Sequence, residues 1–173
     1  MLFRLGMGLV LLFSCGYAGI LLSKRFQSRV IQLGELQNAL VQLEYDIDYL
    51  CVPLGESFEK IAKNTESELK NVFIYISRRL KDNPGCDMYR LWKRAFSKFS
   101  MDIALTDEDL AAMTEFSKML GLGSREKEKN NIKITQMRLK ILEESAKCDA
   151  EKNIKMYRGL GFLAGCFLVI VLL

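Results

Sequence analysis

Histidine is absent from this chain of 173 residues, and proline occurs only twice. Without histidine the chain cannot form the Ser-His or Cys-His pairs that activate nucleophiles, or the common zinc sites. The five cysteines include no C-x-x-C pair, and Cys51, Cys86 and Cys148 are widely spaced, which is typical of reduced thiols in a cytoplasmic domain. The scarcity of proline leaves long stretches free to form helix.

Motifs for nucleotide binding and acid–base catalysis are also missing. There is no G-x-x-x-x-G-K-[ST] loop, and the G-x-G triplets at 6–8 and 159–161 lie in or beside apolar stretches, not between a strand and a helix. The carboxylates of Glu143 and Glu144, like those of Asp46 and Asp48, are one or two positions apart and project from different sides of a helix. We therefore expect no enzyme, no cofactor, no metal and no nucleic-acid partner.

Two long uncharged apolar stretches are present, one at each end, Leu5 to Leu22 and Gly159 to Leu173. The first has 18 residues and as a helix reaches roughly 27 Å, close to the ~30 Å hydrocarbon thickness of a bilayer. The second has only 15 residues, and needs Met156, Tyr157 and a snorkelling Arg158 to cross. We predict transmembrane helices over residues 1–23 and 156–173, with a cytoplasmic domain over 24–155.

Three other interpretations compete for the N-terminal stretch: a cleaved signal peptide, a lipoprotein signal at Leu12-Phe13-Ser14-Cys15, and a buried core helix. The apolar run continues seven residues past Cys15, and Phe13 is bulky for a lipoprotein signal. Lys24 and Arg25 bring charge to a place where a signal peptidase needs small residues. We favour a retained anchor over these three.

Basic residues flank both apolar stretches on the side of the central domain. They are Lys24, Arg25 and Arg29 after the first stretch, and Lys152, Lys155 and Arg158 before the second. Because such residues are held on the cytoplasmic side, both junctions place the central domain in the cytoplasm and both termini on the opposite side. Much of the net charge of +4 lies at these junctions, which favours anionic lipid headgroups over nucleic acid as a partner.

Apolar residues recur at steps of three and four through the central domain, with no sustained alternation. This spacing predicts an all-α bundle of about five to six helices. The first helix ends before Pro53 and carries one apolar stripe, made of Leu33, Leu36, Leu40, Leu43, Ile47 and Leu50. A short helix over residues 54–64 follows.

Local signals divide the rest of the domain. Thr65 and Glu68 form a capping box for a helix that ends at Asn83-Pro84-Gly85, and the next helix has an aromatic face with Trp92 in the core. Thr106 and Asp109 form an acidic variant of the box for a helix that ends at Gly121 and Gly123. Ser124 then caps a last helix that runs to the C-terminal end.

Two sets of residues are candidates for contacts. Small residues four apart predict close helix packing in the membrane: Ser14 with Ala18, Cys15 with Gly19, and Gly161 with Gly165 in a G-x-x-x-G motif. Arg125, Lys129 and Lys133 on the last helix are candidates for a partner surface. A solvated charged face explains the same three residues, and we prefer that explanation.

The order of these features resembles the stage III sporulation protein AB family of endospore-forming bacteria. The resemblance is densest in the run from Lys155 to Gly165, preceded by Leu120-Gly121, and includes Lys24-Arg25-Phe26 and the Pro53-Leu54 pair. It covers nearly the whole length and is weakest between Thr65 and Asp102. Each short motif is unspecific, so the order and spacing carry the resemblance.

The resemblance implies a place in the mother cell's outer forespore membrane, within a channel-like complex that links mother cell and forespore. The family's helical domain is similar to the cytoplasmic domain of the F-type platform proteins of type II secretion and type IV pilus systems. It implies as partners a secretion-type ATPase, stage III sporulation protein AA, and the other membrane subunits. This chain has one such domain where the platform proteins have two, so rotor-like mechanics are not expected. The family offers no catalytic residues.

Two functional classes remain open. One is a scaffold that couples a soluble ATPase to membrane partners, and the other is a two-anchor sensory or ligand-binding module. A receptor would place the bundle outside and continue into an output domain, whereas this chain stops at Leu173 and its charges place the bundle inside. These features favour the scaffold, and self-association is left open.

Overall fold

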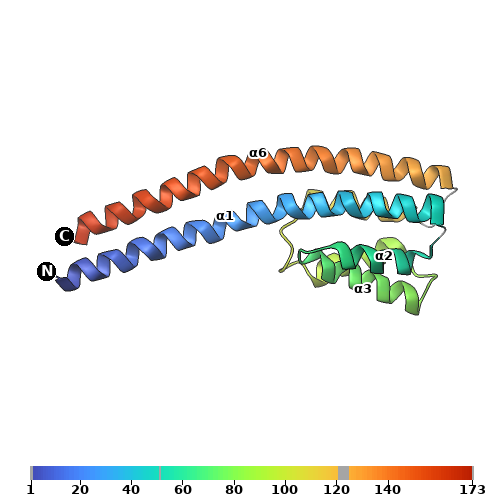
Figure 1. The fold of residues 1–173 in the computed structure, drawn as a ribbon, viewed down its shortest axis with the longest axis horizontal. Coiled ribbons are helices and arrows are strands. Elements are labelled where there is room, and N and C mark those ends of the chain that lie inside the picture. Colours follow the sequence, from blue (N-terminus) through green and yellow to red (C-terminus); the bar gives the residue numbers. More distant parts are fainter. Residues whose placement is uncertain (1, 51, 121–124, 173) are drawn as a thin grey trace. The chain divides into compact units, whose positions relative to one another are not determined.

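A computed structural model describes the backbone of residues 2–50, 52–120 and 125–172, and the side chains of 24–50, 52–120, 126–154 and 156. Within those residues the chain is all-α, with no strand, as the apolar spacing predicts (Figure 1). The elements are α1 (Leu2–Tyr45), the π-helical segment η1 (Asp46–Leu50), α2 (Leu54–Asn64), α3 (Leu69–Asp82), α4 (Met88–Lys98), α5 (Asp107–Met119) and α6 (Arg125–Leu172).

The chain divides into two compact units. The terminal unit consists of Met1–Val30 with Ser145–Leu173, and the bundle unit of Ile31–Glu144. In the terminal unit, the guanidinium of Arg29 on α1 lies 3.8 Å from the carboxylate of Asp149 on α6. No helix among the described residues is long and apolar enough to cross a bilayer. Apart from Met156, the side chains of the predicted spans 1–23 and 156–173 lie outside the described residues.

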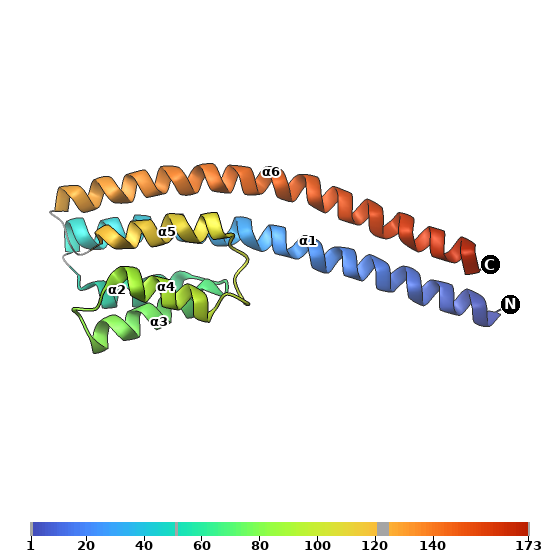
Figure 2. The same cartoon turned by 180° about the vertical axis from the view of Figure 1, so that it is seen from behind.

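An aromatic cluster forms the centre of the bundle unit. Trp92 and Phe96 from α4 meet Phe58 from α2 and Phe73 from α3, with ring centroids 5.3 to 6.3 Å apart. Trp92 is 1% exposed, which confirms its predicted place in the core. Figure 2 shows α4 beside α3 and α5 within this unit. Trp92 meets Phe58 and Phe73 edge to face, and pairs of this kind add specific attraction to the area that they bury.

A glycine allows α2 to lie close to α3. A β-carbon at Gly55 would lie 3.1 Å from Cγ of Lys81 and 3.4 Å from Cβ of Leu80. The hydroxyl of Ser77 on α3 donates a hydrogen bond of 2.7 Å to the carbonyl oxygen of Gly55. The absence of a side chain at this position therefore lets the two helices come close enough to be bonded directly.

Several predicted helix ends are confirmed. The second helix spans Leu54–Asn64, and α3 ends at Asp82 before the Asn83-Pro84-Gly85 turn. The capping box of α5 is complete, because the amide of Asp109 donates to Thr106 and the amide of Thr106 donates to the Asp109 carboxylate over 2.9 Å. The predicted signals at Gly121, Gly123 and Ser124 lie outside the described residues.

Two local predictions are wrong. Thr65 does not cap α3: its hydroxyl donates a hydrogen bond of 2.8 Å back to the carbonyl oxygen of Ile61, at the end of α2. In the first helix, the predicted apolar stripe stops at Leu43, because Leu50 is 49% exposed. Asp46, which is not part of the predicted stripe, is buried instead. The π-helical segment η1 explains this change, because its wider turn shifts the phase of the residues that follow.

Candidate functional site

The predicted partner surface divides into residues with different roles. The ammonium of Lys129 lies 2.7 Å from the carboxylate of Asp48 in η1, and this hydrogen bond raises the pKa of Lys129 above its usual value. Lys133, about one turn further along α6, is exposed. The side chain of Arg125 lies outside the described residues. Lys129 therefore ties the start of α6 to the end of the first helix, while Lys133 faces solvent.

A buried carboxylate connects the end of the first helix to α2. Asp46 is fully buried, and it accepts hydrogen bonds from the Ser57 hydroxyl over 2.6 Å and from the Gln42 amide over 3.0 Å. The ammonium of Lys60 lies 3.6 Å away. A carboxylate in the interior is tolerated only when its oxygens are bonded in this way, so these partners are structural requirements of the joint.

A second carboxylate on α1 holds the start of α3. Glu35 accepts hydrogen bonds of 3.0 Å from the backbone amides of both Glu66 and Ser67, and also binds the Ser67 hydroxyl. Gln32, three residues earlier, donates to the Glu68 carboxylate over 3.1 Å and accepts from the Ala104 amide over 2.8 Å. Through these two side chains α1 is bonded to the turn before α3 and to the segment between α4 and α5.

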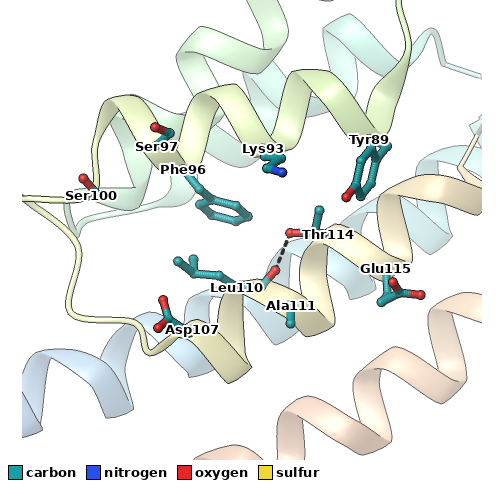
Figure 3. A pocket seen from close by; sticks show the side chains of 10 residues that line it. All are labelled: Tyr89, Lys93, Phe96, Ser97, Ser100, Asp107, Leu110, Ala111, Thr114 and Glu115. Atoms are coloured by element: carbon teal, nitrogen blue, oxygen red, sulfur yellow. Dashed lines mark hydrogen bonds between the residues drawn. The ribbon is translucent and has the colours of Figure 1, made fainter.

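A shallow hollow of about 390 Å³ lies between α4 and α5 (Figure 3). Phe96 of α4 and Leu110 and Ala111 of α5 give it an apolar lining, while Lys93 and Glu115 supply opposite charges. Figure 3 also shows the Thr114 hydroxyl bonded to the Leu110 carbonyl of its own helix. Most of the lining is apolar, so the hollow is suited to an apolar side chain of a partner.

A larger hollow of about 540 Å³ lies where α2 and α4 begin and α3 and α5 end. Leu54, Leu80, Met88 and Leu120 line it with apolar surface, and the half-buried thiol of Cys86 also borders it. Both hollows are therefore apolar recesses of a helical surface. Among the described residues, no group of three or more Cys, Asp or Glu side chains is placed to hold a metal ion.

Comparison with known proteins supplies the family. The family model for stage III sporulation protein AB matches residues 4–173. The chain belongs to the stage III sporulation protein AB family. It is 28% identical over 158 residues to stage III sporulation protein AB of Bacillus subtilis (strain 168), covering 91% of each chain. A solved structure of a stage III sporulation protein AB has the same fold, with a TM-score of 0.66 and 24% identity over 72% of this chain and 97% of that one.

Membership of the sporulation family confirms the resemblance inferred from the order of the terminal motifs. The sequence analysis missed the polar contacts that join the helices, above all those of Glu35 and Asp46. Neither carboxylate gives a local signal in the sequence. The predicted apolar stripe steps from Leu43 to Ile47 and passes over Asp46, and the amide partners of Glu35 lie 31 and 32 residues away. The predicted packing residues Ser14, Cys15, Ala18, Gly19, Gly161 and Gly165 lie outside the described side chains.

Proposed function

We propose that this member of the stage III sporulation protein AB family is a non-enzymatic, membrane-anchored scaffold of the sporulation channel complex. In this role the helical bundle couples a cytoplasmic secretion-type ATPase, stage III sporulation protein AA, to the membrane subunits. The complex lies in the mother cell's outer forespore membrane. Residues 1–23 and 156–173 are the anchors, and the bundle is on the cytoplasmic side.

The observation that supports this role best is the way the bundle holds α1. Glu35 and Gln32 bond α1 to the turn before α3, and Asp46, the residue after α1, is bonded to Ser57 of α2. Since α1 begins at Leu2, the helix held by these contacts also includes the predicted N-terminal anchor. The chain therefore passes from the contacts that hold α1 to the predicted anchor without leaving helical backbone.

A binding experiment with the full chain tests the proposal. The chain would be placed in lipid nanodiscs and titrated with the purified ATPase, with and without nucleotide, using empty nanodiscs as the control. We expect a complex at micromolar concentration whose affinity changes with nucleotide. Absence of binding at micromolar concentration in both states would contradict the coupling role.

A substitution in the hollow between α4 and α5 tests whether the ATPase binds there. Ala111 is exposed and lines this hollow, so Ala111→Trp would fill it without entering the core. Glu66→Trp places the same bulk on another exposed position. We expect Ala111→Trp to weaken ATPase binding and Glu66→Trp to leave it unchanged, as measured by the same titration.

A further inference from the structure

The bundle part of α6 exposes three large apolar side chains on one face. Ile134, Met137 and Ile141 are 58%, 68% and 69% exposed, although the same helix buries Ile132 and Leu139 almost completely. The spacing of three and four residues places the exposed three in one line along the helix. This outer stripe, Ile134, Met137 and Ile141, is therefore turned away from the core rather than being the margin of it.

Basic residues border the outer stripe on both sides. At 100° per residue, Lys133 and Lys140 fall on one side of it and Arg138 on the other, and all three are exposed. Lys129 does not belong to this group, because it is paired with Asp48. The surface thus combines an apolar line one heptad long with positive charge along both edges.

We propose that the outer stripe is a docking site for an acidic amphipathic helix of a partner protein. A helix that binds along another helix places its apolar residues at intervals of three and four, which matches Ile134, Met137 and Ile141. The residues next to such a seam determine the choice of partner through their charge. With Lys133, Lys140 and Arg138 beside the seam, a partner with Glu or Asp at the flanking positions gains attraction on both edges.

A second copy of this chain fits the surface poorly. Pairing two outer stripes in either direction would bring Lys140 and Arg138 of one copy against lysine or arginine of the other, and like charges across a helical seam repel. The inference goes beyond the proposed function, because it concerns a site distinct from the α4–α5 hollow. It does not require the partner to be the ATPase.

A designed peptide tests the site directly. The probe is a fluorescein-labelled helix of three heptads with Leu at the seam positions and Glu at the flanking positions, titrated by anisotropy with the full chain in neutral-lipid nanodiscs. We expect binding that weakens at high salt and is reduced at least about tenfold by Met137→Glu. Met101→Glu is the matched control, because Met101 is 91% exposed outside the outer stripe and its replacement should change nothing.

Charge reversal distinguishes specific binding at this site from non-specific binding of peptides to the surface. The double variant Lys133→Glu, Lys140→Glu should lose the acidic peptide and gain binding of a peptide with Lys at the flanking positions. Equal binding of both peptides to the unaltered chain would overturn the proposal, as would unchanged binding by Met137→Glu. If circular dichroism shows that Met137→Glu does not fold, Ile141→Gln serves in its place.

Two other ligands of the outer stripe, a second copy of the chain and a lipid surface, would each give a different result. The detergent-solubilised chain could sediment as a dimer, and Met137→Glu could dissociate that dimer. This result would assign the outer stripe to a second copy and overturn the proposal. Binding to phosphatidylglycerol vesicles that Met137→Glu abolishes, without binding of the acidic peptide, would assign it to lipid and also overturn the proposal.

Discussion

The hydroxyl of Ser57 donates a hydrogen bond of 2.6 Å to the carboxylate of Asp46, and both side chains are fully buried. Ser57 lies in the first turn of α2, and Asp46 begins the π-helical segment after α1. The bond therefore fixes the corner at which the chain turns from its first helix into the rest of the bundle. Removing either partner leaves a buried polar group without its bond.

Replacing this carboxylate should destabilise the protein. Asp46→Ala leaves the Ser57 hydroxyl without its acceptor, and we expect it to lower the free energy of unfolding by about 2 to 3 kcal/mol. Chemical denaturation of the detergent-solubilised chain measures this through Trp92, the single tryptophan. Asp102→Ala, at an exposed position, is the control and should cost little. Equal stability of the two variants would contradict the structural role of Asp46.

Glu35 should stabilise the turn before α3 although it lies on another helix. Glu35→Ala deprives the amides of Glu66 and Ser67 of their acceptor, and we expect the free energy of unfolding to fall by about 1 to 2 kcal/mol, because two backbone amides lose a hydrogen bond to a charged group. Glu66→Ala removes an exposed carboxylate from the same turn and should have little effect. The same denaturation experiment compares them, and a Glu35→Ala variant as stable as Glu66→Ala would refute the assignment.

These two carboxylates show where prediction from sequence succeeds and fails in this fold. The bounds of α2, the capping box of Thr106 and the burial of Trp92 depend on signals within a few residues, and each is confirmed. The Thr65 cap failed because α3 begins only at Leu69, and the turn before it is held by Glu35, 31 residues from Glu66. Local patterns cannot reveal such partners, since the distance between them closes only when the helices pack.

The same distinction applies to the candidate surfaces. In sequence, Lys129 and Lys133 are equivalent candidates for a partner surface. In the structure, Lys129 forms an ion pair with Asp48, which is 81 residues away in the chain. On α6, Ile132 and Ile134 are only two residues apart, and the structure gives them opposite environments: Ile132 is 1% exposed and Ile134 is 58% exposed.

An exposed ion pair gives a pH dependence of known sign. Hydrogen bonds from Lys81 first, and then Lys63, lower the pKa of Glu59 from 4.5 to about 2. Because the folded pKa is the lower one, the pair stabilises the fold fully above pH 4.5, and this stabilisation is lost as the pH falls from 4.5 towards 2.

The comparison of Glu59→Gln with the unaltered chain tests that sign. At neutral pH the unaltered chain should have the higher denaturation midpoint, and the difference should shrink to nothing as the pH falls to about 2. High salt should reduce the difference at neutral pH, because the side chains are partly exposed to solvent. Lys81→Met should reproduce the loss. A difference that grows on acidification would contradict the assignment.

The glycines of the C-terminal apolar segment should support helix packing in the membrane. Gly161→Leu and Gly165→Leu each place a bulky side chain on the predicted contact face, and we expect either to weaken association of the membrane segments by about 1 kcal/mol. Cys166→Leu changes a position on another side of the helix and is the control. A membrane two-hybrid assay measures the association, and unchanged signals in both glycine variants would argue against this packing.

The thiol of Cys148 reports the topology of the chain. This cysteine is exposed and lies in the predicted cytoplasmic domain 24–155, so it should react readily wherever reagent reaches that domain. In a variant whose other cysteines are serine, a membrane-impermeant maleimide should label Cys148 in inverted vesicles but not in intact cells, because the basic residues at both junctions favour a cytoplasmic bundle. Labelling of permeabilised cells confirms that the thiol is reactive. If intact cells were labelled as strongly as inverted vesicles, the bundle would lie on the other side of the membrane, out of reach of a cytoplasmic ATPase, and the proposed coupling would fail with the topology.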